Sequence, residues 1–267
     1  MVRILHNLSF VEDPTRAFRA VRFECRYDFV MGRQTLSLLK GAVRRQLFHR
    51  LSPARLFAEL RAILSEKRPV AALARMEELE LLGFIHPGLP FGPPERELME
   101  QLDERLAWWK FTFPDEPVSA WRVRLKGLLD PLPDDELRRM ADRLGGAGRE
   151  IAAVEEGRHR GRQAARAIAA AGEIGAGTLH AILSPLSVEE GLYLAVRSGD
   201  RRVAEGVTRY LTTLRHATAL VTGADLLAAG FTPGRSLGEM LAQLFRAQLD
   251  GKVTTKEEAL AWADARR

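Results

Sequence analysis

The sequence FVEDPTRAFRAVRF, residues 10–23, begins the first long helix that we expect in this 267-residue chain. Pro14 suits the first position of a helix, where its missing N–H is not needed, and Asp13 before it suits the N-cap. The pattern predicts a helix from Pro14 to about Tyr27. The same kind of pattern, rich in Leu, Ala, Arg and Glu and closed by Gly or Pro, recurs along the chain.

Helices are expected throughout, and no run shows the β-branched alternation that is typical of strands. One of them carries an apolar stripe at three-residue spacing, formed by Leu73, Met76, Leu79 and Leu82. The densest cluster of helix breakers, residues 86–94, indicates a boundary or a long loop. From residue 147 on, we expect short helices in a bundle or superhelix. The sequence therefore predicts an all-α, multi-helical protein without a sizeable β-sheet. The expected helices before that point are residues 53–65, 69–83, 95–110, 117–129 and 134–144.

The composition excludes several classes of protein. Hydrophobic residues make up 46% of the chain and charged residues 28%, which supports a packed core and argues against disorder. The apolar runs are shorter than the roughly 18 to 20 residues that a membrane span needs. Residues 1–10 do not resemble a signal peptide, and the single Cys25 cannot form an internal disulfide or a zinc site. We therefore expect a cytoplasmic protein that does not bind a membrane.

The positive charge is concentrated at the start of the chain. Residues 1–70 carry 14 Lys and Arg against 6 Asp and Glu, whereas the remainder carries 26 against 29. A clustered basic excess is typical of a surface that binds a polyanion. We therefore expect the first quarter of the chain to contact phosphate groups.

Glu12, Asp13 and Arg16 form the most informative group. Their spacing of three and four residues lets all three reach one helix face. Asp accepts hydrogen bonds while Arg donates them, so an Asp13/Arg16 pair matches the edge of adenine or cytosine and rejects uracil or guanine. Glu12 would hold Arg16 in position. The alternative is a helix cap with an ordinary ion pair at i,i+4.

Arg19 and Arg22 continue from Arg16 at three-residue spacing, with Arg26 beyond them. Such a stripe suits a triphosphate or an RNA backbone, although it also fits a solvated helix face. Phe18 and Phe23 beside it are expected to pack rather than to stack on bases.

Residues 10–16 and 19–23 resemble the start of the neck domain in class II tRNA nucleotidyltransferases and poly(A) polymerases, the CCA-adding and A-adding enzymes. The spacing Glu-Asp-x-x-Arg followed by Arg-x-x-Arg-Phe carries this resemblance. Residues 35, 51–60 and 81–87 are similar to the rest of that neck, although the family usually has Glu-Arg where this chain has Ala54-Arg55. Residues 223–234, 238–241 and 249–253 resemble the family's tail, which often has Pro at the position of Arg235.

The resemblance implies an all-α arrangement of neck, body and tail, at residues 1–86, 87–175 and 176–267. It implies that Asp13 and Arg16 read the base of incoming ATP or CTP, that Glu12 braces Arg16, and that Arg19 and Arg22 contact phosphates. The body and tail would bind the tRNA acceptor arm. The arginines that could touch its backbone are Arg158, Arg160, Arg162 and Arg166, for which a solvated helix face is an alternative.

The family's catalytic head binds two metal ions through paired carboxylates, so Mg²⁺ is expected there. No Gly-Ser/Gly-x-Asp-x-Asp segment occurs in this sequence. We therefore expect this chain to bind no metal, to depend on an N-terminal head as partner, and to be inactive alone, whether it is an excised piece or a natural remnant. Two alternatives stay open, a stand-alone helical RNA-binding module and a helical protein-binding scaffold.

Three other features have no expected catalytic role. The histidines at positions 6, 49, 86, 159, 180 and 216 lack metal-ligand spacing. The aromatic cluster of Trp108, Trp109, Phe111 and Phe113 is expected to pack between helices, with base stacking as the alternative. Residues 145–148 predict a turn and not a phosphate-binding loop.

Overall fold

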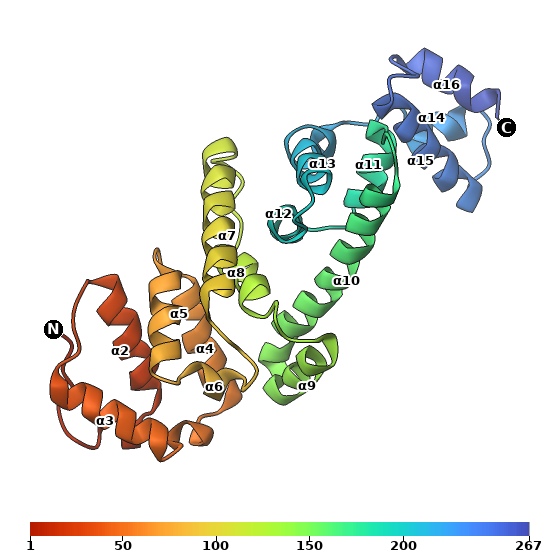
Figure 1. Ribbon diagram of the computed structural model, residues 1–267. Helices are drawn as coiled ribbons and strands as arrows, with labels where there is room; N and C mark the ends of the chain where they lie inside the picture. Colours follow the sequence, from red (N-terminus) through yellow and green to blue (C-terminus); the bar gives the residue numbers. More distant parts are fainter. Residues whose placement is uncertain (267) are drawn as a thin grey trace. The chain divides into compact units, whose positions relative to one another are not determined.

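A computed structural model describes residues 1–266 and confirms the all-α prediction (Figure 1). Within this range there is no β-sheet, only an isolated bridge between Val2 and Met31. Short 3-10 helices lie at Leu47–Arg50, Gly145–Ala147 and Leu214–His216. The α-helices are α1 (Ser9–Glu12), α2 (Thr15–Arg26), α3 (Arg33–Arg44), α4 (Pro53–Leu64), α5 (Pro69–Glu78), α6 (Leu82–Ile85), α7 (Pro93–Thr112), α8 (Ala120–Leu128), α9 (Asp134–Leu144), α10 (Gly148–Ala170), α11 (Ala176–Leu183), α12 (Val188–Arg197), α13 (Arg201–Thr212), α14 (Gly223–Ala228), α15 (Arg235–Leu249) and α16 (Lys256–Asp264).

The chain divides into two compact units, Met1–Arg158 and His159–Arg267. The long helix α10 begins in the first unit and ends in the second. Its length of 23 residues corrects the expectation of short helices after residue 147. The division into neck, body and tail at residues 86 and 175 stays a prediction.

In the first unit, α2 packs against α4 and α5, and α7 packs against α8. A large apolar core runs through this unit from Phe10 to Val154. The burial predicted for the stripe is confirmed for all four residues, Leu73, Met76, Leu79 and Leu82. They do not share one helix as predicted, because α5 ends before Leu79 and Leu82 begins α6. Burial of such a stripe, rather than helix propensity, supplies most of the stability of a short helix.

The helix that starts at Pro69 ends earlier than the sequence predicts. We expect Gly83 to end it, but α5 stops at Glu78. Glu80 takes a left-handed conformation with a φ of 58°, and the Leu81 N–H donates to the Met76 carbonyl at 2.8 Å. This is the Schellman pattern of helix termination, formed without glycine at the left-handed position.

Two other helix starts also differ from the prediction. α2 begins at Thr15 with Pro14 as its cap residue, although Asp13 still accepts a hydrogen bond from the Thr15 N–H. α8 begins at Ala120, three residues after the predicted start at Pro117. By contrast, α9 spans Asp134–Leu144 as predicted.

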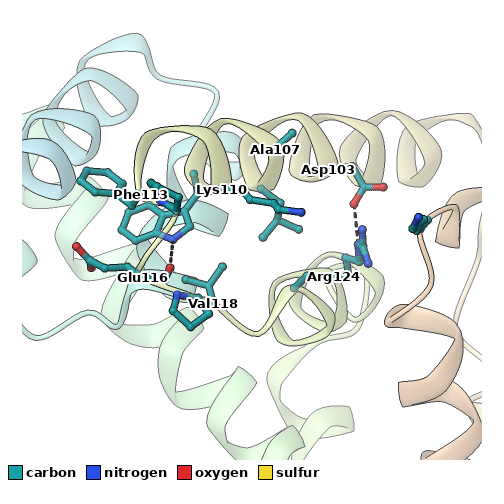
Figure 2. A pocket seen from close by; sticks show the side chains of 13 residues that line it. Asp103, Ala107, Lys110, Phe113, Glu116, Val118 and Arg124 are labelled. Atoms are coloured by element: carbon teal, nitrogen blue, oxygen red, sulfur yellow. Dashed lines mark hydrogen bonds and ion pairs between the residues drawn. The ribbon is translucent and has the colours of Figure 1, made fainter.

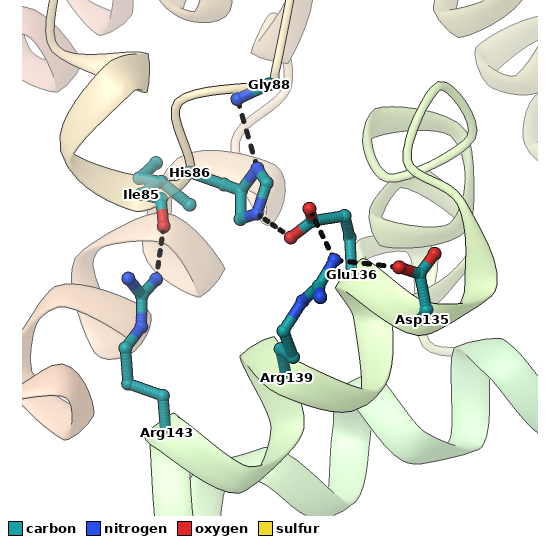
Figure 3. Close-up of polar contacts among 7 residues, drawn as sticks. All are labelled: Ile85, His86, Gly88, Asp135, Glu136, Arg139 and Arg143. Carbon is teal, nitrogen blue, oxygen red and sulfur yellow. Dashed lines mark hydrogen bonds and ion pairs between the residues drawn. The ribbon is translucent and has the colours of Figure 1, made fainter.

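The loop that contains the predicted boundary is fixed to α9 (Figure 3). The Gly88 N–H donates a hydrogen bond to His86 Nδ1 at 3.1 Å. The proton of the imidazole therefore lies on Nε2, which donates to Glu136 Oε2 at 3.1 Å. Arg143 donates to the Ile85 carbonyl at 2.8 Å. Hydrogen bonds from Arg139 and His86 lower the pKa of Glu136. The breaker cluster is therefore an anchored connection within the first unit.

In the second unit, α11 packs against α15, and α12 packs against α13. The backbones of α11 and α15 approach closely at Gly177, where an added Cβ would lie 2.5 Å from the Arg246 carbonyl oxygen. A second apolar cluster contains Leu226 and Leu244. Among residues 1–266, no helix has both the length and the apolar character required to cross a membrane.

Candidate functional site

The turn between α1 and α2 holds Asp13, the first of the predicted site residues. Asp13 Oδ1 accepts three hydrogen bonds, from the Thr15 N–H at 3.2 Å, the Thr15 hydroxyl at 2.6 Å and Arg55 Nη2 at 2.9 Å. Partial burial raises the pKa of Asp13, but these hydrogen bonds and the Arg55 charge outweigh it and leave the pKa below its ordinary value. Asp13 is therefore held ionised, with one oxygen anchored and Oδ2 without a partner among residues 1–266.

Arg16 lies on the first turn of α2, three residues after Asp13 in the sequence. Its Nη1 is 3.5 Å from Glu12 Oε2 and donates to the Ser9 carbonyl at 3.3 Å. His6 Nε2 also lies 3.4 Å from Glu12 Oε2. The remaining N–H groups of Arg16 have no partner in the described part of the chain, so they can donate to a ligand.

Asp13 pairs with Arg55 and not with Arg16. The ion pair joins residues that are 42 positions apart in sequence, one in the turn before α2 and the other on α4. Local spacing could not have predicted this contact. It follows only when α2 packs against α4, and it makes Arg55 a member of the site that the sequence did not assign.

Arg19 and Arg22 differ in their surroundings. Arg19 is exposed and forms no ion pair within residues 1–266. Arg22 is mostly buried, and its Nη1 lies 3.3 Å from Glu66 Oε1, while Arg26 Nε lies 3.0 Å from Glu66 Oε2. Arg19 is thus available to an anionic ligand, whereas Arg22 is engaged with Glu66.

Glu59 lies on α4, near the charges of Arg19 and Arg22 and those of Asp13 and Arg55. Its Oε2 is buried without a hydrogen-bond partner in the described structure. Burial raises its pKa, which the positive charges of Arg22 and Arg19 partly oppose. Contacts between α2 and α4 therefore bring the Glu59 carboxylate near the positive charges of Arg22 and Arg19.

The four predicted RNA-contacting arginines lie on α10, in different environments. Arg158 is in the first unit and donates to the Leu132 and Leu129 carbonyls at 2.5 and 2.8 Å. Arg160 in the second unit contacts Glu190 at 2.6 Å. Arg162 and Arg166 are exposed. The donors of Arg158 and Arg160 thus bind protein acceptors, and the side chains of Arg162 and Arg166 are more exposed than theirs.

A pocket of about 460 Å³ lies between α7 and the segment that leads into α8 (Figure 2). Phe113, Glu116 and Val118 lie at one end, and Asp103 with Arg124 at the other. Trp109 is buried, and its Nε1 donates to the Glu116 carbonyl at 2.8 Å, so packing is confirmed for this aromatic residue. In contrast, Phe111 is 89% exposed.

No group of three or more His, Cys, Asp or Glu side chains is placed to hold a metal ion within residues 1–266. Cys25 is partly exposed. Burial, and to a lesser degree the nearby Glu24 charge, raises the pKa of its thiol.

Two family models match parts of this chain. Residues 28–91 match the model described as "Probable RNA and SrmB-binding site of polymerase A". Residues 212–263 match the model described as tRNA nucleotidyltransferase domain 2. The first covers the later neck motifs at residues 35, 51–60 and 81–87 but not residues 10–23, and the second covers the tail motifs at residues 223–253.

Relatives and solved structures cover nearly all of this chain. The A-adding tRNA nucleotidyltransferase of Geobacter sulfurreducens is 34% identical over 97% of this chain and 30% of its own length. That of Halalkalibacterium halodurans is 26% identical over 98% of this chain and 58% of its own length. The Thermotoga maritima CCA-adding enzyme complexed with tRNA is 28% identical, with a TM-score of 0.74 over 99% of this chain and 63% of that one. A CCA-adding enzyme in complex with ATP is 27% identical, with a TM-score of 0.78 over 99% of this chain and 63% of that one.

Proposed function

Since this chain belongs to the family of A-adding and CCA-adding tRNA nucleotidyltransferases and spans part of its relatives' length, we propose that it recognises the incoming nucleotide and binds tRNA. Asp13 and Arg16 read the base of ATP or CTP, and Glu12 orients Arg16. Arg19 contacts the phosphates. Arg22 has a smaller part in this site, because Glu66 engages it.

The observation that carries this proposal is the half-satisfied state of both reading groups. Asp13 has one oxygen fixed by three donors and one oxygen free to accept. Arg16 has one nitrogen bound to protein acceptors and further N–H groups free to donate. An acceptor beside a donor complements the Watson–Crick edge of adenine or cytosine, since each offers an amine next to a bare ring nitrogen.

The same reasoning predicts selection against the other two bases. Uracil and guanine present a ring N–H beside a carbonyl, so they would face Asp13 and Arg16 with the donor and acceptor exchanged. A polar group left unpaired in a site of this kind discriminates strongly between ligands. We therefore expect ATP and CTP to bind, and UTP and GTP to bind weakly.

For tRNA, we propose that the exposed Arg162 and Arg166 on α10 contact the backbone of the acceptor arm. Arg158 and Arg160 contribute less, because they are less exposed than Arg162 and Arg166. We propose that nucleotidyl transfer takes place only in a complete enzyme, where a catalytic head binds the Mg²⁺ that the reaction needs. A cytoplasmic location stays a prediction.

The test is nucleotide binding by calorimetry. Asp13→Ala or Arg16→Ala removes a charge-assisted hydrogen bond of about 1.5 to 3 kcal/mol, so affinity for ATP and CTP should fall roughly ten- to hundredfold. Asp225→Ala is a matched control, because Asp225 also anchors a turn through Thr222 and a basic partner, Lys256. Arg201→Ala is the control for Arg16, since its carboxylate partner Glu205 also lies four residues away.

Two results would favour the alternatives. Binding of tRNA that is unchanged in Asp13→Ala and Arg16→Ala, with no nucleotide binding by the unmodified chain, would indicate a stand-alone RNA-binding module. Absence of both nucleotide and tRNA binding at low salt, where phosphate contacts are strongest, would indicate a protein-binding scaffold.

A further inference from the structure

A second pocket lies at the far end of α2 from Asp13. It has a volume of about 550 Å³ and opens between the last turn of α2 and the segment that joins α4 to α5. Its lining includes four basic residues, Arg22, Arg26, Lys67 and Arg68, and it lies entirely within the first unit. Of its lining, only Arg22 also belongs to the nucleotide site proposed above.

Exposed aromatic rings continue from the edge of this pocket. Tyr27 is 54% exposed and lines the pocket, while Phe29 beside it is also exposed. The ring centroids of Phe23 and Tyr27 are 6.1 Å apart, and those of Tyr27 and Phe29 are 5.5 Å apart. The Arg26 guanidinium lies 6.0 Å from the Tyr27 ring centre. A run of exposed rings beside cations is typical of a surface that stacks on another planar group.

The charges around the pocket favour an anion. Glu66 is 9% exposed and is neutralised by Arg22 and Arg26, at 3.3 and 3.0 Å. Arg68 pairs with Asp28 at 2.6 Å. Lys67 forms no ion pair with any of the described residues. The lining thus holds four cations and only two carboxylates. Lys67 and the exposed parts of Arg26 and Arg68 are left to contact the negative charge of a ligand.

We infer that this pocket binds one unpaired nucleotide of an RNA strand, with the base stacked on Tyr27 and the phosphate beside Lys67 and Arg68. A paired base inside a duplex exposes no ring face, whereas a single strand offers its bases to aromatic side chains and its phosphates to cations. The inference rests on the proposed RNA-binding role, and the pocket shares only Arg22 with the proposed nucleotide site. It begins at Arg22, six residues beyond Arg16 along α2, a helical rise of about 9 Å.

Cys25 provides a direct reporter, because it lines the pocket and is the only cysteine of the chain. Its alkylation by iodoacetamide can be followed by mass spectrometry in a slightly alkaline buffer. We expect a six-nucleotide single-stranded RNA to slow this reaction several-fold. A blunt RNA duplex, and ATP or CTP alone, should leave it unchanged.

Affinity measurements with variants test the stacking contact. Tyr27→Ala should weaken binding of the single-stranded RNA at least fivefold, the lower end of the range for loss of one base–aromatic stack. Tyr27→Phe keeps the ring and should bind as the unmodified chain does. Phe111→Ala is the matched control, because it removes an exposed aromatic residue from α7. All variants should keep their affinity for ATP.

The outcomes separate this inference from the proposed function. RNA binding without protection of Cys25, or equal affinity of Tyr27→Ala and the unmodified chain, would overturn the pocket while leaving the tRNA-binding proposal intact. Equal protection by the duplex, or protection by an acidic peptide instead of RNA, would also overturn it. If the unmodified chain binds no RNA, both proposals for RNA fail together, whereas the nucleotide site is judged by Asp13 and Arg16.

Discussion

Arg124 joins three parts of the first unit, so its replacement by alanine gives a sharp test of the packing. Arg124 Nε donates to Asp103 Oδ1 on α7 at 2.6 Å. Its Nη1 donates to the carbonyls of Leu64 and Glu66, at 2.7 and 3.0 Å. The residue is 8% exposed. It thereby fixes the end of α4 and the segment that carries Lys67.

The expected loss of stability follows from what Arg124→Ala leaves behind. Removing one partner of a buried ion pair typically costs about 3 to 5 kcal/mol, because the other charge stays unpaired. Asp103 keeps some contact with water, which argues for the lower end, while two carbonyls also lose a donor. We therefore expect the free energy of unfolding to fall by about 3 kcal/mol.

The assay is urea unfolding followed by circular dichroism, with Arg122→Ala as control. Arg122 lies two residues away on the same helix and also contacts a carboxylate, Glu150, at 2.8 and 3.0 Å. Its side chain is 48% exposed, and exposed ion pairs contribute at most about 1 kcal/mol. Equal losses for Arg124→Ala and Arg122→Ala would refute the argument that burial decides the effect.

A double variant tests the cause of the loss. Burial raises the pKa of Asp103 even with Arg124 beside it, which shows that its charge is poorly solvated. Asp103→Asn in the Arg124→Ala background removes this charge. It should recover part of the lost stability, about 1 kcal/mol or more. A further loss instead would mean that the unpaired carboxylate is not the source of the effect.

Two further predictions concern other regions. Gly177→Ala should lower the melting temperature, because its Cβ would lie 2.5 Å from the Arg246 carbonyl oxygen, whereas Gly41→Ala meets no atom within 4 Å and should raise it slightly. Hydrogen bonds from Lys256 and Thr222 lower the pKa of Asp225. The ionised carboxylate therefore stabilises the fold fully at a pH above its ordinary pKa of 3.8, and this stabilisation decreases as the pH falls below that value. The difference in melting temperature between the unmodified chain and Asp225→Asn should therefore be clear at neutral pH and shrink in acid; a constant difference would contradict this.

Much of the fold could be predicted from local patterns. The helix at Asp134–Leu144 and the buried stripe that includes Leu73 and Met76 follow from periodicity and from helix start and stop signals. The end of α5 could not be predicted in this way. It depends on Glu80 taking a left-handed conformation, whereas the sequence predicts that the helix ends at Gly83.

The candidate site divides in the same way. The spacing of Glu12, Asp13 and Arg16 is local, and together with the family resemblance it predicts that these residues read the base. Local spacing does not predict the partner of Asp13, because Arg55 lies 42 positions away and reaches Asp13 only where α4 packs against α2. Likewise, sequence alone gave Arg22 a phosphate contact, whereas the structure pairs it with Glu66.

The sequence by itself determined the all-α class, the helical stripes and the residues that carry the family resemblance, because these depend on interactions over a few positions. Only the tertiary structure decided which charges are already paired, which are buried and which remain free for a ligand. Availability of a charge depends on neighbours that distant segments supply. For this reason Arg158, Arg22 and Arg19, which look alike in the sequence, have different surroundings in the folded chain.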